Sequence, residues 1–349
     1  MMRTSFRLGL AVALTGLFAA SAAAQQEFDA RALAAAVASH VRHAVDRRDR
    51  DQRDRDKNEQ VERITKTVKI GAAGQVDLSN ISGDIVVTAG GGDEVKIDVV
   101  KRGRGPTDAD AKRQLELLTI DIIERTGRVE VRSRYKEGER HINASADYTV
   151  TAPAGALVTA RSVSGDIRVT GIKGELDVET VSGDVRLDGV GQLGRAKTVS
   201  GDVDVSGAQV DGTLEASSVS GNVIARAVKA RRIELGTVSG NVELVDAACD
   251  TVTAKAVSGE VSFTGALAKG GRYAFKSHSG DVRLVLAGEV GFEIEASTFS
   301  GTIKSDLPLT IGGKRESAVS HRTIRGVYGD GGAFLDVTTF SGSVVIRKR

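Results

Sequence analysis

The stretch VETVSGDVRL, residues 178–187, contains a phrase that the chain spells ten times. Each copy has Ser-Gly, then one further residue, then Val or Ile. The copies are ISGDI (81–85), VSGDI (163–167), VSGDV (181–185), VSGDV (199–203), VSGNV (219–223), VSGNV (238–242), VSGEV (257–261), HSGDV (278–282), FSGTI (299–303) and FSGSV (340–344). From Ser164 to Ser300 the successive spacings are 18, 18, 20, 19, 19, 21 and 21 residues. A nearly fixed period of this length is typical of a repeat architecture.

Apolar residues alternate on both sides of each Ser-Gly, and the alternation changes parity across it. With the Ser as position zero, positions −6 and −4 are apolar, as in Leu176 and Val178, and position −2 is usually small. Position +3 is β-branched in all ten copies: Ile85, Ile167, Val185, Val203, Val223, Val242, Val261, Val282, Ile303 and Val344. This pattern predicts two half-buried strands joined by a tight bend that turns both apolar faces toward one interior.

The bend residues have chemistry that suits a corner. Glycine at +1 supplies the backbone freedom that such a bend needs. These glycines are expected to form a structural turn ladder of Gly165, Gly183, Gly201, Gly221, Gly240, Gly259, Gly280 and Gly301. The Asp or Asn that usually follows at +2 is expected to hydrogen-bond local backbone.

One such unit cannot bury its own apolar face, whereas stacked copies can. We therefore predict an all-β protein, a parallel β-solenoid with coils of about 18–21 residues, in which each coil pairs with the next at about 4.8 Å. Regular repeats are expected over 156–349 and irregular β coils over 63–155. Within the irregular part, TDADAKRQLELL (107–118) follows Pro106 and predicts one short helix with Thr107 as its N-cap.

The N-terminal region has a different composition. Residues 1–24 combine Arg3 and Arg7, an apolar run and a small-residue cleavage site, which predicts a signal peptide and an exported protein, periplasmic or at the cell surface. No membrane span is expected after cleavage. Residues 25–62 are expected to form a helical segment and a charged linker. The part over 47–60 fits a solvated helix or linker, and alternatively a contact with charged envelope polymer.

The charge balance and the cysteine content limit the classes of partner that the chain is expected to bind. Beyond residue 24 the chain holds 46 Lys and Arg against 46 Asp and Glu, so the basic excess expected of a nucleic-acid binder is missing. The single cysteine, Cys249, has no internal disulfide partner. It is expected to be a buried small hydrophobe rather than an exposed dimerising thiol.

Two arrangements were weighed as metal sites. Stacked +2 acids resemble a calcium ladder, but Asn222 and Asn241 interrupt it and the glycine-rich nonapeptide of calcium-binding solenoids is absent, so turn chemistry is preferred. His40 and His43 have no further ligand at metal spacing. No catalytic, cofactor or metal residue is assigned, and no cofactor is expected.

Position −1 is Val in most copies and becomes His278, Phe299 and Phe340 toward the C-terminus. This column fits either an exposed apolar strip or corner packing, and corner packing is favoured. If part of it is exposed, Phe299, Phe340 and His278 are the best candidates for a contact surface.

Three stretches together resemble the bacterial putative-adhesin family: QVDLSNISGDIVVTAGGGDEVKIDVVKRG (75–103), the VSGDV coils, and YGDGGAFLDVTTFSGSVVIRKR (328–349). The resemblance covers roughly residues 63–349. It implies a toast-rack-like β-solenoid, a cell-envelope location and a non-enzymatic role, and it carries over no catalytic residues. The chain departs from the family phrase at HSGDV, FSGTI and FSGSV, which points to specialised C-terminal coils.

Two classes of function remain. The favoured one is a binding or structural module that presents a sheet face to an envelope or surface glycan, to a protein, or to another copy of itself. The alternatives are a carbohydrate-active enzyme on a β-helix scaffold, or an envelope-stress or regulatory partner protein. The enzyme is disfavoured because the acids fall on regular positions, Trp is absent and aromatic residues make up 4% of the chain.

Overall fold

The computed structural model describes residues 58–139, 141–311, 314–316 and 322–349. The predicted signal peptide, the predicted N-terminal helix with His40 and His43, and the charged segment up to residue 57 lie outside the described residues.

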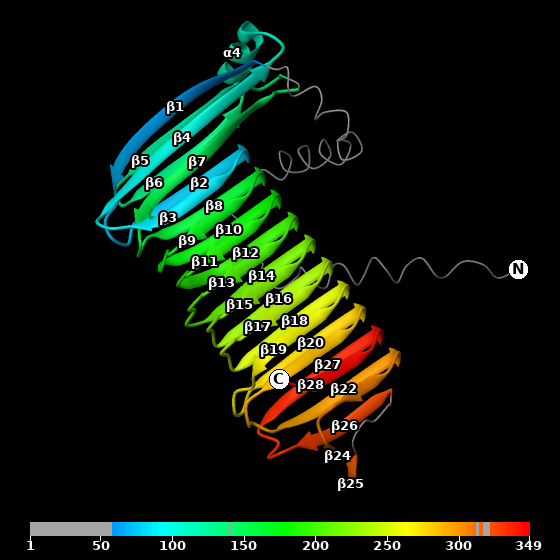
Figure 1. Cartoon of the computed structure of the whole chain (residues 1–349). Coiled ribbons are helices and arrows are strands. Elements are labelled where there is room, and N and C mark those ends of the chain that lie inside the picture. Colours follow the sequence, from blue (N-terminus) through cyan, green and yellow to red (C-terminus); the bar gives the residue numbers. More distant parts are fainter. Residues whose placement is uncertain (1–57, 140, 312–313, 317–321) are drawn as a thin grey trace, which may run out of the picture. The chain divides into compact units, whose positions relative to one another are not determined.

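Two long β-sheets make up the fold (Figure 1). In the described residues, sheet I has 13 strands in the spatial order β1 (Asn58–Lys69), β4 (Glu94–Gly105), β7 (Ala144–Pro153), β3 (Ile85–Gly90), β9 (Ile167–Thr170), β11 (Val185–Asp188), β13 (Val203–Ser206), β15 (Val223–Arg226), β17 (Val242–Val245), β19 (Val261–Ala266), β21 (Val282–Ala287), β28 (Val344–Lys348) and β23 (Ile303–Ser305).

Sheet II has 15 described strands. They follow the order β25 (Lys314–Glu316), β24 (Leu309–Ile311), β26 (Thr323–Tyr328), β22 (Phe292–Ser300), β27 (Ala333–Ser341), β20 (Arg272–Ser279), β18 (Thr251–Ser258), β16 (Arg232–Ser239), β14 (Thr213–Ser220), β12 (Gln192–Ser200), β10 (Glu175–Ser182), β8 (Leu157–Ser164), β2 (Gln75–Ser82), β6 (Arg128–Tyr135) and β5 (Leu118–Arg125).

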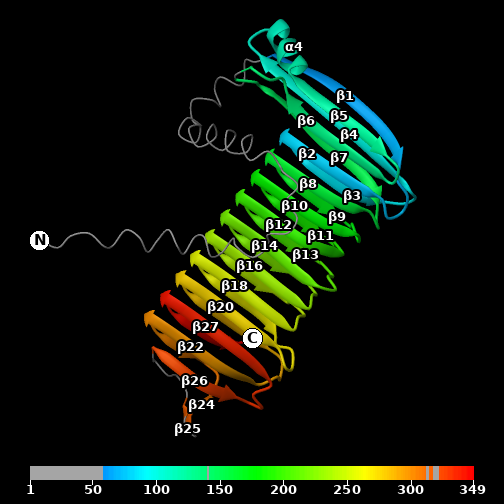
Figure 2. The ribbon, with the colours of Figure 1, turned by 180° about the vertical axis from the view of Figure 1, so that it is seen from behind.

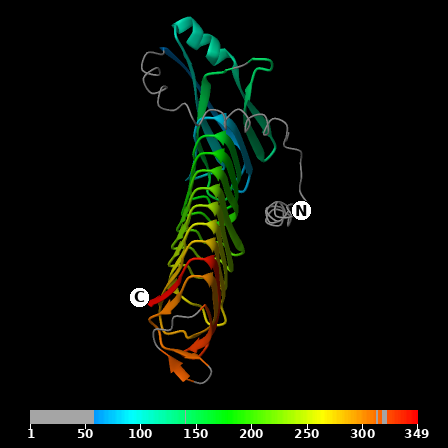
Figure 3. The same ribbon diagram turned by 90° about the vertical axis from the view of Figure 1, so that its right-hand side faces the viewer.

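Each regular coil contributes one strand to each sheet, joined at Ser-Gly. From β8 and β9 to β20 and β21, every strand pairs in parallel with its equivalent in the next coil (Figure 3). In β10, Leu176, Val178 and Thr180 point inward and are buried, while the residues between them face outward. The inward residues of both sheets form one continuous core. The predicted parallel β-solenoid is confirmed.

An insertion closes the N-terminal end of the coils. β2 and β3 pair directly with β8 and β9, although residues 91–156 separate them in the chain. The intervening strands extend both sheets: β7 continues sheet I beside β3, with antiparallel β4 beyond it, and β6 continues sheet II with antiparallel β5. Strand β1, which precedes β2 in the chain, pairs antiparallel with β4 at the end of sheet I. The first strand begins at Asn58, so the last residues of the predicted linker belong to sheet I.

The predicted short helix is present as α4 (Asp108–Glu116). Thr107 is its N-cap, and the backbone amide of Asp110 donates a hydrogen bond to the Thr107 hydroxyl at 3.1 Å. Ala111 is buried against β4, where Gly103 leaves the space: a Cβ atom at Gly103 would lie 2.4 Å from the carbonyl oxygen of Ala111.

The prediction that each coil pairs with the next is wrong at the C-terminal end. The last coil, β27 and β28, lies between the coil of β20 and β21 and the coil of β22 and β23. Figures 1 and 2 show β27 in red between β20 and β22. After β22 and β23 the chain forms the antiparallel strands β24, β25 and β26, which cover the edge of sheet II. It then returns as β27, which pairs with both β20 and β22.

Within the described residues, no helix combines the length and the apolar character that crossing a membrane requires.

Candidate contact surface

Glycine makes the corner between the two sheets. The eight predicted ladder glycines all have φ between +144° and +159°, a region that L residues adopt only at a cost. At Gly201, φ is +148° and a Cβ atom would lie 2.1 Å from the carbonyl oxygen of Gly183 in the neighbouring coil. The Gly201 amide donates to the Ser220 carbonyl on the other side at 3.0 Å. Each corner therefore needs glycine for its conformation and for close stacking.

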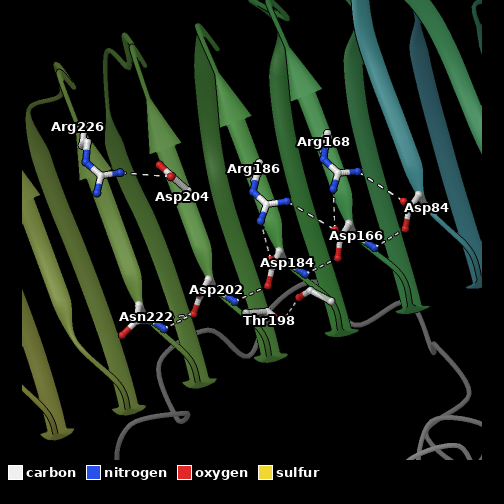
Figure 4. Close-up of polar contacts among 11 residues, drawn as sticks. Asp84, Asp166, Arg168, Asp184, Arg186, Thr198, Asp202, Asp204, Asn222 and Arg226 are labelled. Carbon is white, nitrogen blue, oxygen red and sulfur yellow. Dashed lines mark hydrogen bonds and ion pairs between the residues drawn. The ribbon is translucent and has the colours of Figure 1, made fainter. Parts of the chain in front are cut away.

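Hydroxyl groups at −2 tie neighbouring corners together from inside. The Thr198 hydroxyl donates to the carbonyl oxygen of Gly183 at 3.0 Å (Figure 4). Equivalent bonds are formed by Thr180, Ser218, Thr237, Ser277, Thr298 and Thr339. Ser162 is buried with no hydrogen-bond partner, because Asn80 already donates to the Gly83 carbonyl that Ser162 would meet. Most of the small residues at −2 are thus hydrogen-bond donors, with Ser162 and Ala256 as exceptions, and their hydroxyl content is the signal that sequence reasoning missed.

The side chains at +2 form a second set of bonds, which we call the acceptor ladder. Asp166 accepts the backbone amide of Asp184 at 3.0 Å, Asp184 accepts that of Asp202 at 2.9 Å, and Asp202 accepts that of Asn222 at 2.6 Å (Figure 4). The prediction that these side chains bond local backbone is wrong, since the bonds run between coils. One oxygen per residue is enough, and this explains why Asn222 and Asn241 fit.

Arginines neutralise part of the acceptor ladder on the outer face. Arg186 contacts Asp184 at 2.8 Å and Asp166 at 3.6 Å, and Arg168 contacts Asp166 at 2.7 Å. Asp202 has no cationic partner among the described residues; its side chain accepts only from Asn222. Among those residues, no group of three or more His, Cys, Asp or Glu is arranged to hold a metal ion. The ladder acids thus have structural partners within the fold.

The −1 column lies on the outer face of sheet II, and the favoured interpretation as corner packing is wrong. Val199, Val219 and Val257 are 46%, 37% and 43% exposed, and Phe340 and Phe299 are 47% and 66% exposed. The cause is strand alternation: −2 points into the core, so −1 points out. We call Ile81, Val163, Val181, Val199, Val219, Val238 and Val257 the valine strip. Within it, Ile81, Val163, Val181 and Val238 are half-buried.

The strip continues into an aromatic end of His278, Phe340 and Phe299. The rings of His278 and Phe340 stack with centroids 4.9 Å apart and an interplanar angle of 11°. Those of Phe340 and Phe299 stack at 4.7 Å and 3°. Phe340 is in the middle because its coil lies between the other two. Both ring faces of Phe340 are covered, so Phe340 presents mainly its edge to solvent, whereas His278 and Phe299 each have a stacked ring on one face.

The opposite turns of the coils hold Cys249, which is buried and has no disulfide partner. Burial raises the pKa of its thiol to about 12, so the reactive thiolate is suppressed at neutral pH. A hollow of about 490 Å³ beside it is lined by alanines, among them Ala230 and Ala247, and by the charged residues Asp211, Lys229, Arg231 and Asp250. Cys249 itself is buried, as the sequence predicts.

Comparison with known proteins adds a family. One family pattern, described as Toastrack DUF4097, matches residues 72–235 and 220–347. The chain belongs to the Toastrack DUF4097 family. The resemblance found in the sequence is thereby confirmed, and the Toastrack pattern spans the insertion as well as the regular coils. No curated protein sequence matches the chain.

Solved structures similar to this Toastrack chain are described as adhesion proteins or lipid-binding proteins. They include a putative cell adhesion protein from Clostridium sporogenes (12% identity, 83% of this chain and 100% of that chain, TM-score 0.30). A putative adhesin from Bacteroides fragilis has 14% identity, covers 82% and 97%, and has a TM-score of 0.39. A putative lipid binding protein from Parabacteroides distasonis has 13% identity, covers 82% and 97%, and has a TM-score of 0.33. At such identities and scores they carry no argument about function.

Proposed function

We propose that this chain is an exported, non-enzymatic, adhesin-like module that binds a protein of the cell envelope through its aromatic end. The observation that carries the proposal is the exposure of Phe299 and Phe340, 66% and 47%, at the end of a continuous apolar row. Large exposed apolar side chains in a contiguous patch mark interaction sites, and aromatic residues are enriched at protein interfaces.

A protein partner is favoured over a glycan by the ring geometry. A sugar ring stacks on the face of an aromatic ring, and both faces of Phe340 are occupied by His278 and Phe299. Ring edges suit insertion between the side chains of a protein groove. The tryptophan platform that a glycan site often offers is also missing, since the chain has no Trp.

A non-enzymatic role is supported by the places that the polar groups occupy. The acids that recur along the coils accept backbone amides and contact arginines, as Asp166 and Asp184 do. Catalytic groups are usually recognised by irregular clustering in a cleft and by shifted pKa values, and the acceptor ladder has neither a cleft nor a free carboxylate pair.

The test uses the mature chain, residues 25–349, immobilised and exposed to solubilised envelope proteins and, separately, to a glycan array. The Phe299→Ser/Phe340→Ser variant should lose the captured protein. The matched control is Phe334→Ser, which changes an exposed phenylalanine (36%) on the same strand as Phe340 but outside the strip. Equal capture by the parent chain, the double variant and the control contradicts the proposal. If a glycan binds the parent and the control but not the double variant, the partner is a glycan and not a protein.

Export is tested at the N-terminus. Mass spectrometry of protein recovered from the envelope should find Gln25 as the first residue, because cleavage is expected after Ala24. Recovery of the chain with Met1 intact contradicts export by this signal.

A further inference from the structure

Two rows of residues, at positions 0 and −3 of successive coils, flank the valine strip. On the corner side is position zero, which is serine in every coil of the strip: Ser82, Ser164, Ser182, Ser200, Ser220, Ser239 and Ser258. On the other side is position −3, which shares the outer face of sheet II with the strip because residues two apart in a strand point the same way. Small serines allow another surface to approach the strip closely.

The charges on either side of the strip are opposite in three of its seven coils, and the first coil has uncharged Ser79 with Asp84. Where −3 is basic, +2 of the same coil is acidic: Arg161 and Asp166, Lys197 and Asp202, Lys255 and Glu260, and beyond the strip Lys276 and Asp281. Where −3 is uncharged in the middle coils, +2 is also uncharged: Ser217 and Asn222, Gly236 and Asn241. The one like-charged coil has Glu179 and Asp184, and there Arg161 and Arg186 contact the two acids.

Most of these charges already have partners inside the chain: Arg283 contacts Glu260 at 3.0 Å, and Lys197 contacts Glu215 at 3.2 Å. Lys255 forms no ion pair within the described residues, and Asp202 has no cationic partner there. These two charges are therefore open to an oppositely charged group of a second molecule.

We propose that the valine strip binds a second copy of this chain, with the two-fold axis parallel to the strip. Rotation about such an axis sets each strip residue against the same residue of the partner copy. It also places the −3 row of one copy beside the corner of the other, next to its +2 acids at the same coil. A two-fold axis perpendicular to the strip sets −3 against −3 instead, with Lys197 against Lys197, and gains nothing from the matched charges.

The size of the surface fits a specific interface. Positions −3, −1 and 0 of the seven strip coils are 21 residues per copy, and stable interfaces use roughly 20–30 residues a side. At about 4.8 Å per coil the strip is about 29 Å long. The inference goes beyond the proposed function, because it uses the valine strip and not the aromatic end. Its consequence is that both aromatic ends lie at the same end of the pair.

Cysteine cross-linking of the mature full-length chain distinguishes the arrangements. In a Cys249→Ser background, Val199→Cys and Val257→Cys are each oxidised as single-cysteine variants. A parallel axis gives covalent dimers with both, because every strip residue meets its own copy. A perpendicular axis through the middle of the strip links only Val199→Cys, the central coil, and that result overturns the proposed arrangement.

The control is Leu157→Cys, which is 37% exposed and lies on the outer face of β8 outside the strip. It should give little dimer. Dimer from Leu157→Cys equal to that from Val257→Cys, or a wild-type chain that sediments as a monomer at every concentration, overturns the inference. Neither result bears on the capture of an envelope protein by the aromatic end, so the two proposals fail separately.

A charge exchange provides a second test that leaves the core untouched. Lys255→Glu should weaken dimerisation on the order of tenfold, because it sets an acid beside Glu260 of the partner copy. The double variant Lys255→Glu/Glu260→Lys should recover most of the affinity. Sedimentation velocity measures the dimer, and circular dichroism checks that each variant is folded. An unchanged dimer constant in the single variant refutes the parallel arrangement.

Discussion

Replacing Gly201 by alanine is expected to cost about 2 to 6 kcal/mol of unfolding free energy. The backbone at φ +148° is strained for an L residue, which contributes about 1–3 kcal/mol. The new Cβ atom would lie 2.1 Å from the carbonyl oxygen of Gly183, so that carbonyl must move. The hydrogen bond from the Thr198 hydroxyl to this carbonyl is then lost, which weakens the contact between the two corners. The buried hydroxyl left without a partner costs about 1–3 kcal/mol.

The matched control is Gly212→Ala in the following turn. A Cβ atom at Gly212 meets nothing within 4 Å, and its φ is not positive. Alanine there should leave stability unchanged or raise it slightly by restricting the unfolded chain. Urea unfolding followed by circular dichroism gives both values. Hydrogen exchange should in addition show faster exchange of the amides at the corners beside Gly201.

Equal stability of the two variants refutes the argument that corner glycines are required for stacking. A large loss in Gly201→Ala with no change in exchange at the adjacent coils would place the cost in local strain alone. The expected cost is a large share of the 5–15 kcal/mol that stabilises a typical domain, so the variant should also express poorly.

The remaining predictions concern charge, backbone strain and pH. Asp202→Asn should keep the unfolding free energy or raise it at low salt, because the side-chain amide oxygen still accepts the backbone amide of Asn222. Asp184→Asn should lower the unfolding free energy by up to about 1 kcal/mol, because the ion pair with Arg186 is lost. The opposite order of the two variants in urea titrations contradicts this. Ala227, at φ +50°, stands where the two preceding coils have Gly189 and Gly207, so Ala227→Gly should raise the free energy of unfolding by up to about 1 kcal/mol and raise the melting temperature with it. For Cys249, burial raises the pKa of the thiol from its ordinary value of 9.0 to about 12 in the folded state. The contribution of this buried thiol to the free energy of unfolding is therefore complete below pH 9. It declines as the pH rises toward 12, by up to about 1.4 kcal/mol per pH unit. The Cys249→Ala variant should lose less stability than the parent between pH 9 and 10.5, and parallel curves would show that the thiol does not titrate as described.

The coil could be predicted from sequence because each of its determinants is local. The alternation around Ser-Gly fixes which residues point inward, and Thr107 fixes the start of α4. The place of Phe340 between His278 and Phe299 could not be predicted. All coils share the same corner chemistry, so nothing in the phrase itself says which copy is the neighbour of which.

The contact surface was predicted only in part, for a related reason. Its three aromatic residues were named, but Val199 and Val257 were assigned to packing because valine is usually buried. Strand parity determines their direction, and parity alone places −1 outward. The acceptor ladder was missed because a bond from Asp184 to the amide of Asp202 joins residues that only the stacking brings together.

The place of the final coil has a consequence for the order in which the chain folds during synthesis. The regular coils up to β18 and β19 pair only with the coils directly before and after them in the chain, so they can form as the chain emerges. The strand β22 has its partner in β27, which is synthesised only after residues 301–332. Closure of this end therefore waits for β27, and β20 stays an open edge until then. A chain released before residue 333 keeps that edge unpaired, which gives a quality-control protease a direct way to tell an incomplete molecule from a finished one.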